Sequence, residues 1–144
     1  MIRSIARIPF LLSLLALLLL PIAASASDLV VANAWLSVPQ PWENSSAYFV
    51  IQNNGAKPRT IVGASSSRCD WIEILRAVLK DGVMDSEKLD QMEIPAGGAV
   101  AFVPRGLSLN LVGLGSLTAG ESITIELEFA DGEKLEIEAV GRDH

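Results

Sequence analysis

Between residues 29 and 140, the apolar residues come in short, partly alternating runs that Gly, Pro, Asn and Asp interrupt. This region lacks the 3.6-residue period of a long amphipathic helix. The pattern is typical of strands joined by tight turns, so we expect an all-β sandwich or barrel of about nine strands. The expected strands are 29–36, 46–52, 60–64, 71–79, 99–103, 107–112, 122–129 and 134–140, with a short piece near 89–94.

The first 26 residues have the organisation of a secretory signal peptide. Arg3 and Arg7 supply a positively charged start, residues 10–20 are an apolar run, and residues 24–26 read Ala-Ser-Ala. The run is shorter than the ~20 apolar residues that a membrane-spanning helix needs. We therefore expect cleavage before Ser27, a single domain over 27–144 and a periplasmic location without membrane contact. No cysteine lies near the cleavage site, so lipidation is not predicted.

Composition excludes several classes of function. The chain has 11 basic and 17 acidic residues, a net charge of -6, and loss of Arg3 and Arg7 with the signal leaves nine basic residues and a charge of -8. This charge repels phosphates, so nucleic acid is not an expected partner. One cysteine rules out an intramolecular disulfide, and the one histidine, His144, is the last residue. Catalysis that needs an imidazole within the domain is excluded, and we expect a protein that is not an enzyme.

The last two strands predict a hairpin with a defined register. Matching their apolar faces requires a three-residue loop, 131–133, in which Gly132 or a neighbour has a positive φ. Leu127 would then face Ile137 in the core. On the outer face, the expected pairs are Glu128 with Glu136 and Glu126 with Glu138.

Several short motifs, in order and spacing, resemble the PCu(A)C family of periplasmic copper chaperones. They are Ala34-Trp35 followed by Pro39 and Pro41, Ser46-Ala47-Tyr48-Phe49 before Asn53-Asn54-Gly55, Val62-Gly63-Ala64-Ser65, Gly82-Val83-Met84, Ile94-Pro95-Ala96-Gly97-Gly98, Pro104-Arg105-Gly106, Gly113-Leu114 and Leu127-Glu128-Phe129. The resemblance covers almost all of 29–140. It implies a cupredoxin-like β-barrel.

The same resemblance implies where copper ligands would lie. The family holds Cu(I) with two histidines and two methionines, and their spacing falls here, without a gap, on Leu75, Ser86, Ser108 and Asn110. Leucine cannot coordinate a metal, and hydroxyl and carboxamide oxygens are hard donors that suit Cu(I) poorly. The sequence therefore predicts a family member with an emptied metal site and no cofactor.

Three other residues are weaker candidate ligands. Met84 and Met92 are expected near one end of the barrel, where packing is the simpler role for both. Cys69 is expected to be a small, partly buried side chain, although the adjacent Arg68 would lower its pKa if both were exposed. His144 is expected at a frayed end.

Two surface features are candidate partner-binding sites. Glu126, Glu128, Glu136 and Glu138 place paired carboxylates on the last hairpin, and like charges facing each other do not stabilise a strand pair. One interpretation is that charges on an edge hairpin prevent edge-to-edge association and keep an exported protein soluble; a docking surface for a basic protein is the alternative. Trp42, in a polar segment, is the tryptophan expected to be exposed and suited to an interface.

These observations lead to one hypothesis and two alternatives. We expect an exported PCu(A)C-like protein that has lost copper and acts through protein contacts, with a copper chaperone or a copper-enzyme assembly factor as the partner. The first alternative is a working Cu(I) chaperone that uses Met84, Met92 or Cys69, or that shares the metal with another chain. The second is a small-ligand binder with an apolar mouth at Leu75 and polar anchors at Ser108 and Asn110.

Overall fold

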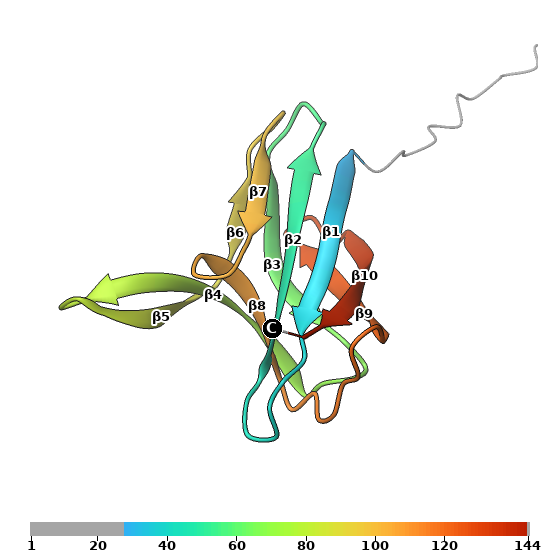
Figure 1. The fold of residues 1–144 in the computed structure, drawn as a ribbon. Helices are drawn as coiled ribbons and strands as arrows, with labels where there is room; N and C mark the ends of the chain where they lie inside the picture. Colours follow the sequence, from blue (N-terminus) through green and yellow to red (C-terminus); the bar gives the residue numbers. More distant parts are fainter. Residues whose placement is uncertain (1–27, 144) are drawn as a thin grey trace, which may run out of the picture.

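The computed structural model describes residues 28–143, and the predicted signal peptide and His144 lie outside this part of the chain (Figure 1). Every regular element within residues 28–143 is a strand. The strands are β1 (Leu29–Ser37), β2 (Ser45–Asn53), β3 (Arg59–Ser65), β4 (Trp71–Lys80), β5 (Val83–Leu89), β6 (Met92–Ile94), β7 (Ala99–Phe102), β8 (Leu107–Val112), β9 (Ser122–Phe129) and β10 (Lys134–Arg142). The described residues contain no helix that is long and apolar enough to cross a membrane.

The prediction of an all-β fold is confirmed, and one strand was missed. β5 carries four consecutive polar residues, Asp85 to Lys88, and only its last residue, Leu89, is partly buried. A strand exposed on both faces has no apolar alternation, which is the signal that sequence analysis uses. The turn before it was predicted: Asp81 and Gly82 have φ values of 52° and 77°, as a two-residue hairpin turn requires.

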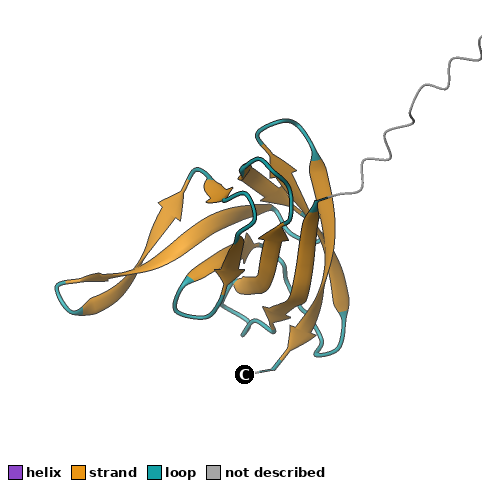
Figure 2. Ribbon diagram, turned by 90° about the horizontal axis from the view of Figure 1, so that it is seen from above, coloured by secondary structure: helices purple, strands orange, loops and turns teal. Residues whose placement is uncertain are grey.

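The strands form one sheet in the order β5-β4-β8-β7-β2-β1-β10-β9-β3-β6, with an additional pairing of β8 with β2. Most neighbours are antiparallel, but β1 with β10 and β7 with β8 are parallel. The sheet curls around one interior, and the hairpin of β4 and β5 projects away from it as an arm (Figures 1 and 2). This arm and the adjoining part of β8 carry the positions that the family resemblance singles out.

The interior is filled by the alternating residues of the strands, as the apolar patterning predicted. In β2 every second residue from Ser45 to Asn53 is buried, and Phe49 stacks on Phe102 of β7 with ring centroids 4.4 Å apart. In β9 the buried residues are Ile123, Ile125, Leu127 and Phe129. The strands thus present one apolar face to a common core, and their opposite faces remain available for function.

The last hairpin has a three-residue loop, but one residue earlier than predicted. The Phe129 N–H donates to the Glu133 carbonyl at 2.9 Å, so the loop is 130–132, and Gly132 has the expected positive φ of 85°. Each strand keeps its core face, while every cross-strand pair moves by two residues. Leu127 faces Leu135 rather than Ile137.

The predicted pairing of the acidic residues is therefore wrong. Glu136 faces Glu126, Glu128 faces Lys134, and Glu138 faces Thr124, whose hydroxyl hydrogen-bonds to its carboxylate. The hairpin is also not at an edge, because β10 pairs with β1 and β9 pairs with β3. Protection of a free sheet edge does not explain these carboxylates.

Candidate functional site

The four positions that match the family's copper ligands lie close together on one outward face of β4, β5 and β8. Leu75 of β4 is directly opposite Ser108 of β8. Asn110 faces Glu73 and Ser86 faces Ala77, so each is one diagonal step from Leu75 on the same face. Leu75, Ser108 and Asn110 are partly buried and Ser86 is exposed. The register derived from the sequence spacing brings these residues together, although none is a soft donor.

A polar network that sequence analysis did not identify crosses this face. Asn110 Nδ2 lies 3.4 Å from one carboxylate oxygen of Glu73, and Lys88 Nζ lies 3.6 Å from the other. Lys88 is the β5 partner of Leu75. Glu73 thus connects β5, β4 and β8. Glu73 lies two residues before Leu75, and residues two apart in a strand are on the same face, so its presence beside Leu75 could have been predicted from the sequence.

The donor chemistry of this face does not fit Cu(I). It offers hydroxyl, carboxamide and carboxylate oxygens, an aliphatic side chain and an ammonium group, whereas Cu(I) prefers thioether, thiolate and imidazole ligands. Within the described residues, there is no cluster of three or more His, Cys, Asp or Glu side chains able to hold a metal ion.

The three alternative ligands are in separate places. Met84 faces Leu79 beside the tip of the β4–β5 arm and is 52% exposed. Met92 pairs with Ile61 and packs against the core. Nearly the whole length of β5 separates the two methionines, so they do not share one end of the barrel as expected. Cys69 lies in the loop between β3 and β4 and also packs against the core.

Cys69 is partly buried, as expected, so the condition under which Arg68 would lower its pKa is not met. Burial raises the pKa of the Cys69 thiol, and the adjacent Asp70 carboxylate raises it further. Arg68 instead pairs with Glu121, at 2.7 Å between Nη1 and Oε1. Its charge is already neutralised by this carboxylate, so Cys69 is not an activated thiol.

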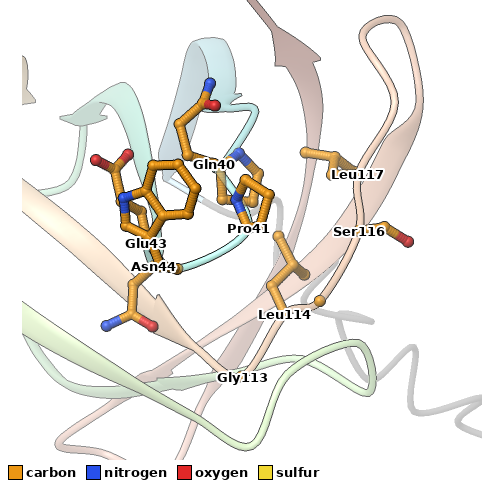
Figure 3. Close-up of a pocket in the computed structure, with 11 residues that line it drawn as sticks. Gln40, Pro41, Glu43, Asn44, Gly113, Leu114, Ser116 and Leu117 are labelled. Carbon is orange, nitrogen blue, oxygen red and sulfur yellow. The ribbon is translucent and has the colours of Figure 1, made fainter.

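Trp42 is 81% exposed, as predicted, and lines an open groove of about 680 Å³. The loop after β1 forms one wall and the loop after β8 forms the other (Figure 3). The lining residues are Pro39, Gln40, Pro41, Trp42, Glu43, Asn44, Gly113, Leu114, Gly115, Ser116 and Leu117. Leu114 and Leu117 are buried and form an apolar base.

The ligand mouth expected at Leu75 is not associated with this groove. A smaller cavity of about 230 Å³ lies beside Glu73 and Lys88, and its lining includes none of Leu75, Ser108 and Asn110. The predicted polar anchors therefore do not line either cavity. The larger concave surface is at Trp42.

The acidic residues of β9 and β10 form an outward-facing surface in the middle of the sheet. Glu126 is opposite Glu136 and also forms an ion pair with Lys134, with 3.4 Å between Lys134 Nζ and Glu126 Oε1. Glu128 and Glu138 extend the surface along the two strands. It remains a predicted docking surface, separate from the Trp42 groove.

Comparison with known proteins agrees with the resemblance deduced from the sequence. Residues 29–140 match the family described as "Putative lipoprotein LpqE-like". The protein "Putative lipoprotein Lxx21020" of Leifsonia xyli subsp. xyli (strain CTCB07) is 29% identical over 109 residues. That match covers 74% of this chain and 65% of the relative, so the chain spans less than two thirds of the relative's length.

Solved structures of similar fold are PCuAC domains. The copper-bound PCuAC domain from PmoF2 superposes with a TM-score of 0.67 at 17% identity, over 81% of this chain and 94% of that domain. The Cu(I) form of DR1885 from Deinococcus radiodurans has a TM-score of 0.64 at 24% identity, over 83% of each chain. At these identities the similarity establishes the fold, and the predicted cupredoxin-like architecture is confirmed.

Proposed function

Because the chain belongs to the LpqE-like family and has a PCuAC-like fold, we propose that it is an exported, non-enzymatic relative of the PCuAC domains that has lost copper binding and acts through protein contacts. The observation that supports this proposal is the face around Leu75. Strand register brings together the four positions that match the family's ligands, yet they carry Leu75, Ser86, Ser108 and Asn110.

The electrostatics of this face also support the loss of copper. Lys88 is directly opposite Leu75, and its ammonium group opposes the approach of a cation. Glu73, which partly neutralises Lys88, is shared with the Asn110 amide. These side chains already satisfy one another and offer a monovalent soft ion no favourable coordination.

A role in protein contact is supported by three surfaces that do not depend on a bound metal. The barrel still presents the broad face of β4 and β8, the Trp42 groove and the acidic surface of β9 and β10. We expect the partner to be a copper chaperone or a copper-enzyme assembly factor, by analogy with the copper-bound PCuAC domain.

Export is supported by the family and by the relative, both described as putative lipoproteins. The chain's one cysteine, Cys69, packs against the core of the domain and is not next to the predicted cleavage site. We therefore propose a periplasmic protein that starts at Ser27. Intact mass spectrometry of periplasmic material tests this, and recovery of a longer chain with the membranes would contradict it.

Competition for Cu(I) against a chromophoric chelator tests the loss of copper. We expect the purified domain to leave the chelator complex unchanged at stoichiometric concentration, because the face around Leu75 lacks soft donors. A stoichiometric complex that outcompetes the chelator would overturn the proposal. If replacement of Met84, Met92 or Cys69 then abolished binding, the protein would be a chaperone with unusual ligands.

A further inference from the structure

The Trp42 groove has an apolar base and an exposed aromatic wall. Leu114 and Leu117 lie at the base, while Trp42 leaves 81% of its surface in solvent. An exposed tryptophan beside buried leucines is a feature of contact surfaces, because large aromatic residues supply much of the binding energy at interfaces. Cavities of this size are also within the usual range for binding sites.

The backbone holds Trp42 in a defined position. The Glu43 N–H donates to the Gln40 carbonyl at 3.0 Å, which closes a turn with Pro41 and Trp42 at its centre. Proline at this position fixes φ near the value that the turn needs. A ring presented by a fixed turn loses little conformational entropy when a ligand binds.

The charge of the groove selects the ligand. Among its lining residues, Glu43 is the one charged side chain. A second carboxylate, that of Asp70, lies next to Gly113 behind the opposite wall, although Asp70 is not itself a lining residue. An exposed indole with the Glu43 carboxylate beside it in the same groove suits an alkylammonium or guanidinium group, which binds the aromatic face and pairs with the acid.

The groove wall at Gly113 follows directly on the end of β8. Asn44 precedes Ser45, the partner of Leu111, and Trp71 is the partner of Val112. Val112 and Trp71 are therefore paired across β8 and β4 beside the groove wall, with Trp71 54% exposed. Glu73 and Asn110 form the next such pair on the same face. The combined surface is elongated, as an extended chain requires.

We propose that the Trp42 groove binds an extended, basic segment of a partner protein, with a Lys or Arg side chain over Trp42 and its charge near Glu43. This inference rests on the protein-contact role proposed above and adds the chemistry of the partner. Apolar residues of the segment pack on Leu114, and its continuation crosses Trp71.

Fluorescence anisotropy with a defined probe tests the groove directly. The probe is a labelled peptide of about twelve residues in which Arg alternates with Pro and Leu, and the reference is the same peptide with Glu in place of Arg. We expect saturable binding of the Arg peptide that weakens with added salt, and none of the Glu peptide. Equal binding of both peptides, or of neither, would overturn the proposal.

Variants locate the binding. Trp42→Ala should lower the affinity for the Arg peptide by at least about tenfold. Glu43→Gln should lower it by about threefold and make it less dependent on salt. The matched control is Glu93→Gln, which removes the same charge from an exposed position on β6, outside both the groove and the acidic surface of β9 and β10, and should leave affinity unchanged. Equal losses from Glu43→Gln and Glu93→Gln would overturn the groove assignment in favour of nonspecific attraction to an acidic protein.

Thermal unfolding verifies that Trp42→Ala is folded, as its exposure predicts. The copper competition experiment is independent of peptide binding. If the protein binds both Cu(I) and the Arg peptide, the proposed loss of copper is wrong and the groove proposal stands. If it binds neither, the groove proposal is wrong and the proposed loss of copper stands.

Discussion

Leu75 of β4 and Ser108 of β8 face each other directly across an antiparallel strand pair. In the register implied by the family resemblance, these are the two histidine positions of a Cu(I) site. Directly opposed side chains in such a pair have Cβ atoms about 4.5–5.5 Å apart, close enough for two imidazoles to share one ion. The backbone thus has an arrangement that a metal site would need, although Leu75 and Ser108 are not Cu(I) ligands of this type.

Restoring the ligands should therefore restore binding. The combined change Leu75→His, Ser86→Met, Ser108→His and Asn110→Met is expected to create a Cu(I) site that competes with a chromophoric chelator. Adding Lys88→Gln should tighten it, because the ammonium group opposite residue 75 is removed.

The matched control moves one histidine to the other face of β4. Arg76→His, in place of Leu75→His, keeps the number of introduced histidines and methionines but places this imidazole on the opposite side of the strand. We expect this variant to bind Cu(I) much more weakly. Equal affinity of the two variants, or no binding by either, would show that the register assigned to the site is wrong.

The variant Glu136→Lys should be more stable than the wild type. Glu136 faces Glu126, so the substitution converts a repulsive cross-strand pair into an attractive one, worth about 0.2–1 kcal/mol in the free energy of unfolding. Chemical denaturation at low and high salt measures the gain, which should shrink as salt screens the charges.

The substitution Glu128→Lys provides a control of opposite sign. Glu128 faces Lys134, so the change should place two positive charges opposite each other and lower the free energy of unfolding by about 0.2–1 kcal/mol. Under the register predicted from sequence alone, Glu128 would face Glu136 and the same substitution would stabilise. The sign of this single measurement distinguishes the two registers.

Asn53 should contribute strongly to stability. Its side chain is fully buried; Nδ2 donates to the carbonyls of Lys57 and Ile94 at 2.7 and 3.2 Å, and Oδ1 accepts from the Gly55 N–H. Asn53→Ala leaves these buried groups without partners and should cost at least about 2 kcal/mol of unfolding free energy. The neighbouring Asn54 is exposed, so the substitution Asn54→Ala should change the free energy of unfolding little. Similar effects of the two substitutions would contradict this role for Asn53.

Cys69 should react slowly with alkylating agents near neutral pH. Burial and the Asp70 carboxylate both raise its pKa, so the reactive thiolate forms only at higher pH than in an ordinary exposed cysteine. The rate of iodoacetamide modification, followed against pH by mass spectrometry, should show this. Asp70→Asn should move the midpoint to lower pH without abolishing the effect of burial. An unchanged midpoint would exclude Asp70 as a cause.

The sequence predicted those features that depend on local periodicity. Alternation in segments such as 122–129 indicated strands and their core faces, and a positive φ was expected at Gly132 or a neighbour and is found at Gly132. β5 escaped prediction because it is held by hydrogen bonds to β4 while its side chains stay in solvent. A strand that forms because it pairs with a neighbouring strand, and not because it buries its own side chains, has no alternating apolar pattern in its sequence.

By itself, the sequence determined the fold class, the family resemblance and the identities of the residues at the four positions that match the family's ligands. Only the tertiary structure decided which residues face one another. It moved the hairpin pairs by two residues, placed that hairpin inside the sheet, joined Glu73 to Lys88 and Asn110, and formed the Trp42 groove from loops about 70 residues apart. Period-two patterning specifies a strand's buried face, whereas a shift of two residues preserves that face, so the hydrogen bonds of the turn and the packing of distant strands must select the register.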